Sequence, residues 1–233
     1  MTASAAVNAS DVLIVGGGLV GASAGFFLRR RGRSVTLLES GLVGRQASGT
    51  NFGNVRRQGR PLHQLPLANR ANAIWRQMNE LLGADVEYLE SGHVRVCYRG
   101  SPEHVGELEA YAQKAHETGL ELELLSGDAM RWRFAFLGPE VLAASYSACD
   151  GHANPRVVAP AFACAAVRGG ATVFENARVA AVEKNGEDFR ALCDDGRVFR
   201  ALDPARKRHH RRGAACRRLS RFAPGQGRPA QYA

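Results

Sequence analysis

Hydrophobic residues fall into two different patterns within the first forty residues of the chain. A short apolar run at 11–15 leads directly into three glycines, and a second β-rich run follows at 34–38. Between them, residues 19–31 suit a helix with Phe26 and Phe27 available to pack inward. Because a strand, a helix and a second strand fit within about thirty residues, the pattern predicts a βαβ unit with parallel strands.

Outside this unit, helical and strand-like segments alternate. Residues 40–60 are rich in Gly, Ser, Arg and Asn, which predicts a long irregular loop. The segments that predict helices are 62–82, 102–119, 126–133 (capped by Ser126) and 156–168. The segments that predict strands are 86–89 and 92–98, paired with each other, then 121–125, 141–147, 172–175, 178–184 and 189–193.

Turn signals separate several of these segments. Residues 150–155, Asp-Gly-His-Ala-Asn-Pro, predict a turn, and Asn-Gly at 185–186 and Asp-Gly at 195–196 predict hairpins. At 1–9 we expect a disordered N-terminus. From residue 204 onward the hydrophobic periodicity vanishes, so this end of the chain has no face that could pack.

The net charge of +9 belongs to one end of the chain. Residues 204–233 carry nine Lys or Arg and no acidic residue, whereas residues 1–203 carry 22 basic and 22 acidic residues. The basic excess is therefore a property of a tail, and we expect no nucleic-acid partner. Arg, Ala, Pro and Gly are typical of a GC-rich gene read out of frame. We interpret 204–233 as a disordered or frameshifted tail.

Composition sets the class of protein. Hydrophobic residues make up 45% and charged residues 23%, as in soluble globular proteins. No apolar run approaches the ~18 residues that span a bilayer, and no secretory signal precedes the first strand, so we expect a cytoplasmic protein without an integral membrane segment. No C-x-x-C pair occurs, which indicates no metal site and incidental thiols in a reducing compartment. The five cysteines are Cys97, Cys149, Cys164, Cys193 and Cys216.

The glycines after the first strand form a G-x-G-x-x-G motif at Gly16, Gly18 and Gly21. The first glycine permits the tight turn, the second lets the backbone approach a pyrophosphate, and the third lets the helix pack close to the strand. The phosphates would meet free N–H groups at the helix start. Glu39 ends the second strand, where an acid accepts hydrogen bonds from ribose hydroxyls. The context therefore predicts a dinucleotide site.

The motif continues in a way that favours FAD over NAD. It runs on through Gly25, Leu28, Gly32, Val35, Leu37 and Glu39. This run resembles the extended signature of flavoproteins with two dinucleotide-binding domains. One departure is Gly25, where that family usually has Ala.

The loop at 44–56 resembles the corresponding loop of the D-amino-acid oxidase superfamily, which includes sarcosine and glycine oxidases and D-amino-acid dehydrogenases. In that superfamily a small-residue loop runs beneath the flavin, and a strand valine meets the adenine. The resemblance implies that these loop residues and Val179 contact FAD. The residues expected to bind the cofactor are Gly16, Gly18, Leu19, Val20, Gly21, Glu39, Ser40, Ala47, Ser48, Asn51, Gly53 and Val179.

Catalytic residues are less readable. His152 has the side chain of a general base, but we expect it to serve the crossover turn. Arg56 and Arg57 are candidate anion contacts near the flavin, against the alternative of solvated loop charges. His63 and His93 have no partner pattern. We name no catalytic residue.

The resemblance covers about residues 10 to 200 and implies an α/β fold. A Rossmann-like FAD domain at 10–60 and 151–203 is interrupted by an α+β substrate domain at 61–150. The superfamily continues with further strands that complete the flavin pocket and carry the carboxylate-binding Arg. We therefore expect an architecture that is incomplete at the C-terminus and holds FAD weakly or not at all.

The resemblance implies an FAD-dependent oxidoreductase that oxidises the C–N bond of an amino acid or secondary amine and acts on a small-molecule substrate. An oligomer is compatible with the sequence, which does not determine the oligomeric state. Two alternatives stay open. An aromatic-ring monooxygenase shares the first turn and would be reduced by NAD(P)H. A nucleic-acid-binding module would depend on the basic tail and on salt.

Overall fold

The computed structural model describes residues 8–186 and 188–202, and a parallel sheet carries the glycine turn. The sheet runs in the order β2 (Val12–Val15), β3 (Val35–Leu38) and β9 (Thr172–Phe174). All four residues of β3 are buried, because β3 is the middle strand. The predicted βαβ unit is confirmed, with β2 and β3 in parallel register.

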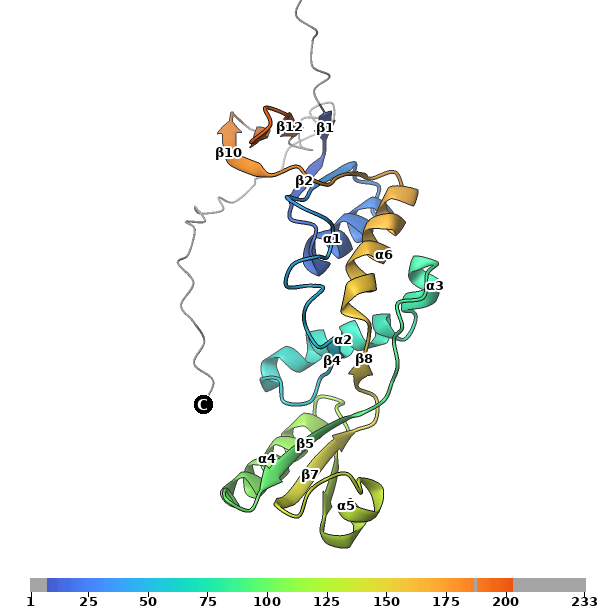
Figure 1. Ribbon diagram of the computed structural model, residues 1–233, viewed down its shortest axis with the longest axis vertical. Helices are drawn as coiled ribbons and strands as arrows, with labels where there is room; N and C mark the ends of the chain where they lie inside the picture. Colours follow the sequence, from blue (N-terminus) through green and yellow to red (C-terminus); the bar gives the residue numbers. More distant parts are fainter. Residues whose placement is uncertain (1–7, 187, 203–233) are drawn as a thin grey trace, which may run out of the picture. The chain divides into compact units, whose positions relative to one another are not determined.

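Two helices pack together beside this sheet. They are α1 (Leu19–Arg30), which follows the glycine turn, and α6 (Pro155–Arg168). The rings of Phe26 and Phe162 meet edge to face with centroids 5.7 Å apart, and Ala22 is fully buried in the same core. Figure 1 shows the two helices side by side. The helix pair therefore fixes the start of α1 against the core.

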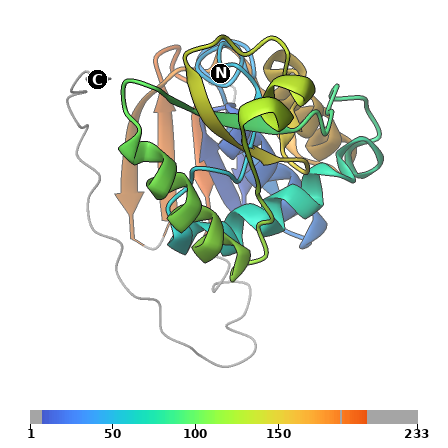
Figure 2. The ribbon, with the colours of Figure 1, turned by 90° about the horizontal axis from the view of Figure 1, so that it is seen from below.

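A second sheet has the order β1-β12-β11-β10. Its strands are β1 (Asn8–Ser10), β12 (Val198–Ala201), β11 (Asp188–Cys193) and β10 (Val179–Asn185). The last three form the orange antiparallel strands of Figure 2. Both predicted hairpins are confirmed, with Gly186 and Gly196 at positive φ in the turns.

A third sheet lies in the middle of the chain. It has the antiparallel order β5 (His93–Tyr98), β7 (Val141–Ser147) and β6 (Glu123–Ser126). The helices of this region are α4 (Glu103–His116) and α5 (Gly127–Arg133). Ser126 stands at the predicted cap position of α5, but its side chain makes no capping hydrogen bond.

The helix predicted at 62–82 is divided into three. A 3₁₀ turn, η1 (Leu62–Gln64), precedes α2 (Leu65–Trp75), and α3 (Met78–Leu82) follows. Gln77 leaves the helical region, with φ −110° and ψ 13°. The helical periodicity continues across this break because apolar residues on both sides enter the same core.

The predicted pairing of 86–89 with 92–98 is wrong. β5 pairs with β7 instead, and Leu89 makes only an isolated bridge to His152. Glu87 has a φ of 54°, which is the left-handed region and interrupts an extended strand. His152, in the turn predicted at 150–155, belongs to a two-residue strand, β8 (Gly151–His152). This strand pairs with β4 (Asn54–Val55), which lies within the loop predicted at 40–60.

At the N-terminus, β1 begins at Asn8 and pairs in parallel with β12, so the last two residues of the segment predicted as disordered form a strand. Residues 1–7 and the tail at 204–233 lie outside the described residues. The mixed α/β class is confirmed, whereas the division into 10–60, 61–150 and 151–203 stays a prediction.

Candidate functional site

The glycine turn has the geometry that its spacing requires. Gly16 has a φ of 103°, and its N–H donates to the Leu38 carbonyl at 2.8 Å, which ties the turn to β3. A Cβ on Gly21 would lie 1.9 Å from the Gly16 carbonyl oxygen and 3.2 Å from the Ile14 side chain. The first glycine therefore supplies the turn conformation and the third supplies the close approach of α1 to β2.

The first turn of α1 meets the loop that follows Glu39. The Leu19 N–H donates to Ser48 Oγ at 2.9 Å. A Cβ on Gly18 would lie 3.0 Å from the same oxygen. Val20, one residue further, is 84% exposed. The structure therefore brings Ser48 to the helix terminus, whose N–H groups favour an anion.

Glu39 is buried at the end of β3 and is bonded to the turn itself. Its Oε2 accepts from the Gly17 N–H at 2.6 Å, and its Oε1 accepts from the Gly41 N–H at 2.9 Å and from Ser40 Oγ at 3.0 Å. Burial alone would raise the pKa of Glu39, but the hydrogen bonds from Gly41 and Gly17 outweigh it and hold the pKa below its ordinary value. Glu39 is therefore an anion that organises the turn.

Gly17 is a site residue that sequence reasoning missed. A Cβ there would lie 3.0 Å from Val43 Cγ2 and 3.1 Å from Glu39 Cβ. The run of three consecutive glycines was the available signal, because the motif itself requires only the outer two.

The other predicted loop residues fold the loop on itself. Asn51 Nδ2 donates to the carbonyls of Ala47 and Ser48, both at 3.0 Å, and its Oδ1 accepts from the Gly53 N–H at 2.7 Å. The Gly53 carbonyl accepts from the Ala153 N–H at 3.0 Å. Asn51 and Gly53 also line a pocket of about 60 Å³ together with Leu19 and Ser48.

Val179 begins β10, just after a segment that is hydrogen-bonded to Glu39. The Ala177 N–H donates to the Glu39 carbonyl at 2.7 Å. Val179 itself is partly buried against a core cluster that contains Leu38 and Ala177. Val179 therefore follows by two residues the amide that binds the Glu39 carbonyl.

Arg57 is paired inside the protein rather than free. Its Nε lies 3.0 Å from Oδ1 of Asp150, whose side chain is fully buried. Asp150 Oδ2 also accepts the backbone N–H groups of Arg57 and Gln58, both at 2.9 Å. Arg56 donates to the Gln58 carbonyl at 2.5 Å. The interpretation of Arg57 as a solvated charge is therefore wrong, and the role of Asp150 was not visible in the sequence.

Gln58 extends this network. It is fully buried, its Nε2 lies 3.0 Å from His93 Nδ1 and donates to the His93 carbonyl at 2.9 Å, and its Oε1 accepts from Ser145 Oγ at 2.5 Å. Burial and the neighbouring Arg56 guanidinium lower the pKa of His93. The network links the loop to β5 and β7.

A second pocket, of about 190 Å³, adjoins this loop. Arg56, Arg57 and Arg60 line it together with Leu19 and Trp75. The predicted crossover residue His152 lies elsewhere: its Nδ1 is 2.9 Å from Ser91 Oγ. The guanidinium groups and the start of α1 therefore share a pocket that His152 does not line.

The residues present fit a dinucleotide. A Cβ on Gly16 would meet no atom within 4 Å, so open space adjoins the turn where a pyrophosphate would approach the start of α1. The Glu39 carboxylate stands at the end of β3, where the ribose hydroxyls of a dinucleotide bound at the turn would meet an acceptor.

No group of three or more His, Cys, Asp or Glu residues that could hold a metal ion occurs among residues 8–186 and 188–202. In the same ranges, no helix has the length and hydropathy of a membrane span. Cys97, Cys149, Cys164 and Cys193 are free thiols.

Comparison with known proteins identifies relatives of this chain. A family model described as FAD dependent oxidoreductase matches residues 11–205. A subunit of the opine oxidase of Rhizobium meliloti is 33% identical over 193 residues, covering 77% of this chain and 51% of that protein. Glycine oxidase of Geobacillus kaustophilus is 29% identical over 177 residues, covering 72% and 46%.

Solved structures agree. The crystal structure of glycine oxidase from Bacillus cereus ATCC 14579 superimposes with a TM-score of 0.71 at 28% identity, covering 82% of this chain and 52% of that one. The chain spans about half the length of the curated relatives it matches. The family match covers the glycine turn, Glu39 and the loop that meets them. The chain belongs to the FAD dependent oxidoreductase family.

Proposed function

We propose that this chain supplies the dinucleotide-binding part of an oxidoreductase that uses FAD to oxidise the C–N bond of an amino acid or secondary amine. One observation carries the proposal. The glycine turn, the buried anion Glu39 and the loop residue Ser48 converge on the first turn of α1 through the hydrogen bonds of Gly17 and Leu19.

Each part of this arrangement suits one part of the cofactor. The N–H groups at the start of α1, next to Gly16 and Gly18, would receive the pyrophosphate. Glu39 would accept the ribose hydroxyls, and Val179 would flank the adenine. Ala47, Ser48, Asn51 and Gly53 would line the path toward the flavin ring.

When bound, FAD supplies the hydride acceptor for the amine. The chain positions the cofactor and places cationic groups nearby. Arg56 and Arg60 line the pocket beside Leu19, and Arg57 is held there by Asp150. The amine or amino-acid substrate class follows from the names of the matched relatives, an opine oxidase and a glycine oxidase.

Titration of the purified chain with FAD, followed by flavin fluorescence and extended to high FAD concentrations because an incomplete pocket should bind weakly, tests the cofactor assignment. Glu39→Ala should weaken binding at least tenfold, because hydrogen bonds to a charged group contribute about 1.5–3 kcal/mol each. Glu183→Ala is the matched control, since Glu183 is exposed on β10. Circular dichroism checks that both variants fold. Equal FAD affinity in the two variants would overturn the assignment.

The reaction class needs a second measurement. The FAD-loaded chain is mixed anaerobically with D-amino acids, N-methyl amino acids and an opine, and separately with NADH and NADPH. Loss of flavin absorbance with an amine supports the proposal. Loss with NAD(P)H alone would favour the monooxygenase alternative and refute the proposed substrate class.

A further inference from the structure

A groove that the cofactor assignment does not use runs along the outer side of α6. It consists of two adjoining pockets, of about 330 and 710 Å³, which share Val43, Arg45 and Pro160. Neither is lined by Leu19 or Glu39. We call the two pockets together the α6 groove. Pockets of this size are typical of small-molecule sites.

The floor of the α6 groove is apolar. Pro160, Cys164 and Val167 line it from α6 at spacings of four and three residues, which places them on one side of the helix. Leu42 and Val173 line it from the other elements. Val167 is 49% exposed and Leu42 is 41% exposed. The stripe faces away from Phe162, which packs against α1.

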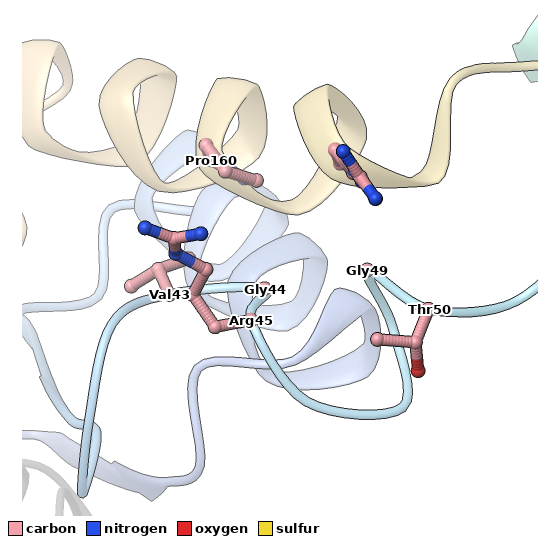
Figure 3. A pocket seen from close by; sticks show the side chains of 7 residues that line it. Val43, Gly44, Arg45, Gly49, Thr50 and Pro160 are labelled. Carbon is pink, nitrogen blue, oxygen red and sulfur yellow. The ribbon is translucent and has the colours of Figure 1, made fainter.

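One end of the groove is cationic. Arg45 and Arg156 line the smaller pocket, and neither has a carboxylate within 4.0 Å among the residues that the structure describes. In Figure 3 the Arg45 side chain extends from the loop toward α6 near Pro160. Glu175, the one acidic residue that lines the groove, accepts the Val43 N–H at 2.8 Å. The groove therefore pairs two uncompensated guanidinium groups with an apolar channel.

We propose that the α6 groove binds a small amphiphilic anion, a long-chain carboxylate. The carboxylate lies between Arg45 and Arg156, and the alkyl chain follows Pro160 to Val167. Eleven residues of helix separate Arg156 from Val167, a rise of about 16 Å, which accommodates a medium-length alkyl chain. The carboxylate is placed at the smaller pocket because both arginines there lack a carboxylate partner among the described residues, whereas the larger pocket holds Glu175 together with Arg168, whose guanidinium donates to the Leu82 carbonyl.

The ligand would also contact the loop that carries the cofactor residues, from its other side. Gly44, Gly49 and Thr50 line the groove, whereas Ser48 and Asn51 line the pocket beside Leu19. The inference does not rest on FAD binding, since neither the glycine turn nor Glu39 lines the groove. The two sites are nevertheless neighbours, because the Gly44 N–H donates to the Gly17 carbonyl at 3.0 Å.

A fluorescence titration of the full chain with 11-(dansylamino)undecanoate, displaced by dodecanoate, tests the proposal. We expect saturable binding that the double variant Arg45→Gln/Arg156→Gln weakens at least tenfold. The matched control is Arg31→Gln/Arg70→Gln, which removes two exposed arginines from elsewhere and should bind unchanged. Dodecanol should displace the probe poorly. Equal affinity in both double variants, or displacement by dodecanol as good as by dodecanoate, would overturn the proposal.

The native thiol Cys164 gives a readout tied to the site. It is exposed and lines the larger pocket, whereas Cys149 does not line the groove. Dodecanoate should slow the maleimide labelling of Cys164 at least fivefold and leave Cys149 unchanged, as measured by peptide mass mapping. Val167→Glu should abolish this protection while circular dichroism stays native. Unprotected Cys164 at saturating dodecanoate would place the ligand elsewhere and refute the inference.

Discussion

Replacing Gly25 by alanine should stabilise the protein, whereas the same change at Gly21 should destabilise it. The two glycines lie one turn apart on α1 and differ in what a Cβ would meet. At Gly25 it would lie 3.6 Å from Ile14 Cδ1 and 3.8 Å from Val35 Cγ1, which is ordinary van der Waals contact. At Gly21 it would lie 1.9 Å from the Gly16 carbonyl oxygen, which is backbone and cannot move aside without reshaping the turn.

The magnitudes follow from these distances. Alanine gains about 1 kcal/mol over glycine in a helix interior. Burying the new methyl group against Ile14 and Val35 adds up to about 0.8 kcal/mol. Gly25→Ala should therefore raise the free energy of unfolding by about 1–2 kcal/mol. Gly21→Ala gains the same helix propensity but overlaps backbone at 1.9 Å, so its cost lies at or above the upper end of the about 1–3 kcal/mol typical of overpacking. The net loss in the free energy of unfolding should therefore be about 2 kcal/mol or more.

Urea unfolding followed by far-UV circular dichroism measures both variants on one scale. Thermal unfolding offers a second measure, with about 2–4 °C expected per kcal/mol for a chain of this size. The reasoning predicts opposite signs for two identical substitutions on one helix. Destabilisation by Gly25→Ala, or a neutral Gly21→Ala, would show that the packing of α1 on β2 differs from the distances above.

Three further changes probe the loop and its supports. Ser48→Ala removes the hydroxyl that accepts the Leu19 N–H. It should lower the free energy of unfolding in urea by about 0.5–2 kcal/mol, as the loss of a helix cap does, whereas Ser48→Thr keeps the acceptor and is the control. Asp150→Asn leaves the Arg57 guanidinium buried without its anion and should cost about 3–5 kcal/mol; a loss below 1 kcal/mol would contradict the pairing. Burial lowers the pKa of His93, so below about pH 6.5 the unfolded chain binds more protons than the folded one, and stability should fall as the pH drops through that window. His93→Gln should flatten this dependence, and an unchanged pH profile would assign it to another group.

Local signals in the sequence predict the cofactor end of the molecule well. The strand, turn, helix and strand around Gly16 to Glu39 are encoded within one short segment. The Asn-Gly and Asp-Gly hairpins follow from the left-handed conformation that only their glycines adopt readily. In each case the residues that determine the structure are neighbours in the chain.

The features that the sequence does not predict depend on distant residues. Residues 86–89 have strand-like composition, but Glu87 adopts a left-handed conformation that interrupts a strand. β5 pairs instead with β7, whose residues lie much further along the chain, as in the pair His93 and Ser147. The contact between Gly17 and Glu39 joins residues 22 apart through a backbone amide, which no side-chain motif records. In the sequence Asp150 is indistinguishable from an ordinary turn residue, whereas in the fold its carboxylate forms an ion pair with Arg57.

The loop that follows Glu39 shows why a cofactor motif is only part of a cofactor site. Although its composition indicates an irregular segment, the loop is anchored at three points: Ser48 to the start of α1, Gly53 to Ala153, and Gln58 to Asp150. The last two anchors come from the segment that leads back from β7 into α6. Closing a loop of this length costs little more entropy than closing a short one, since each doubling adds only about 0.6 kcal/mol, so such distant anchors can hold the loop. The amides of Gly16 and Gly17 donate to residues 22 positions away, whereas two of the three anchors of the loop come from the segment around Asp150. A dinucleotide that reaches Ser48 beside Leu19 would therefore meet a loop held by residues that lie more than a hundred positions further along the chain.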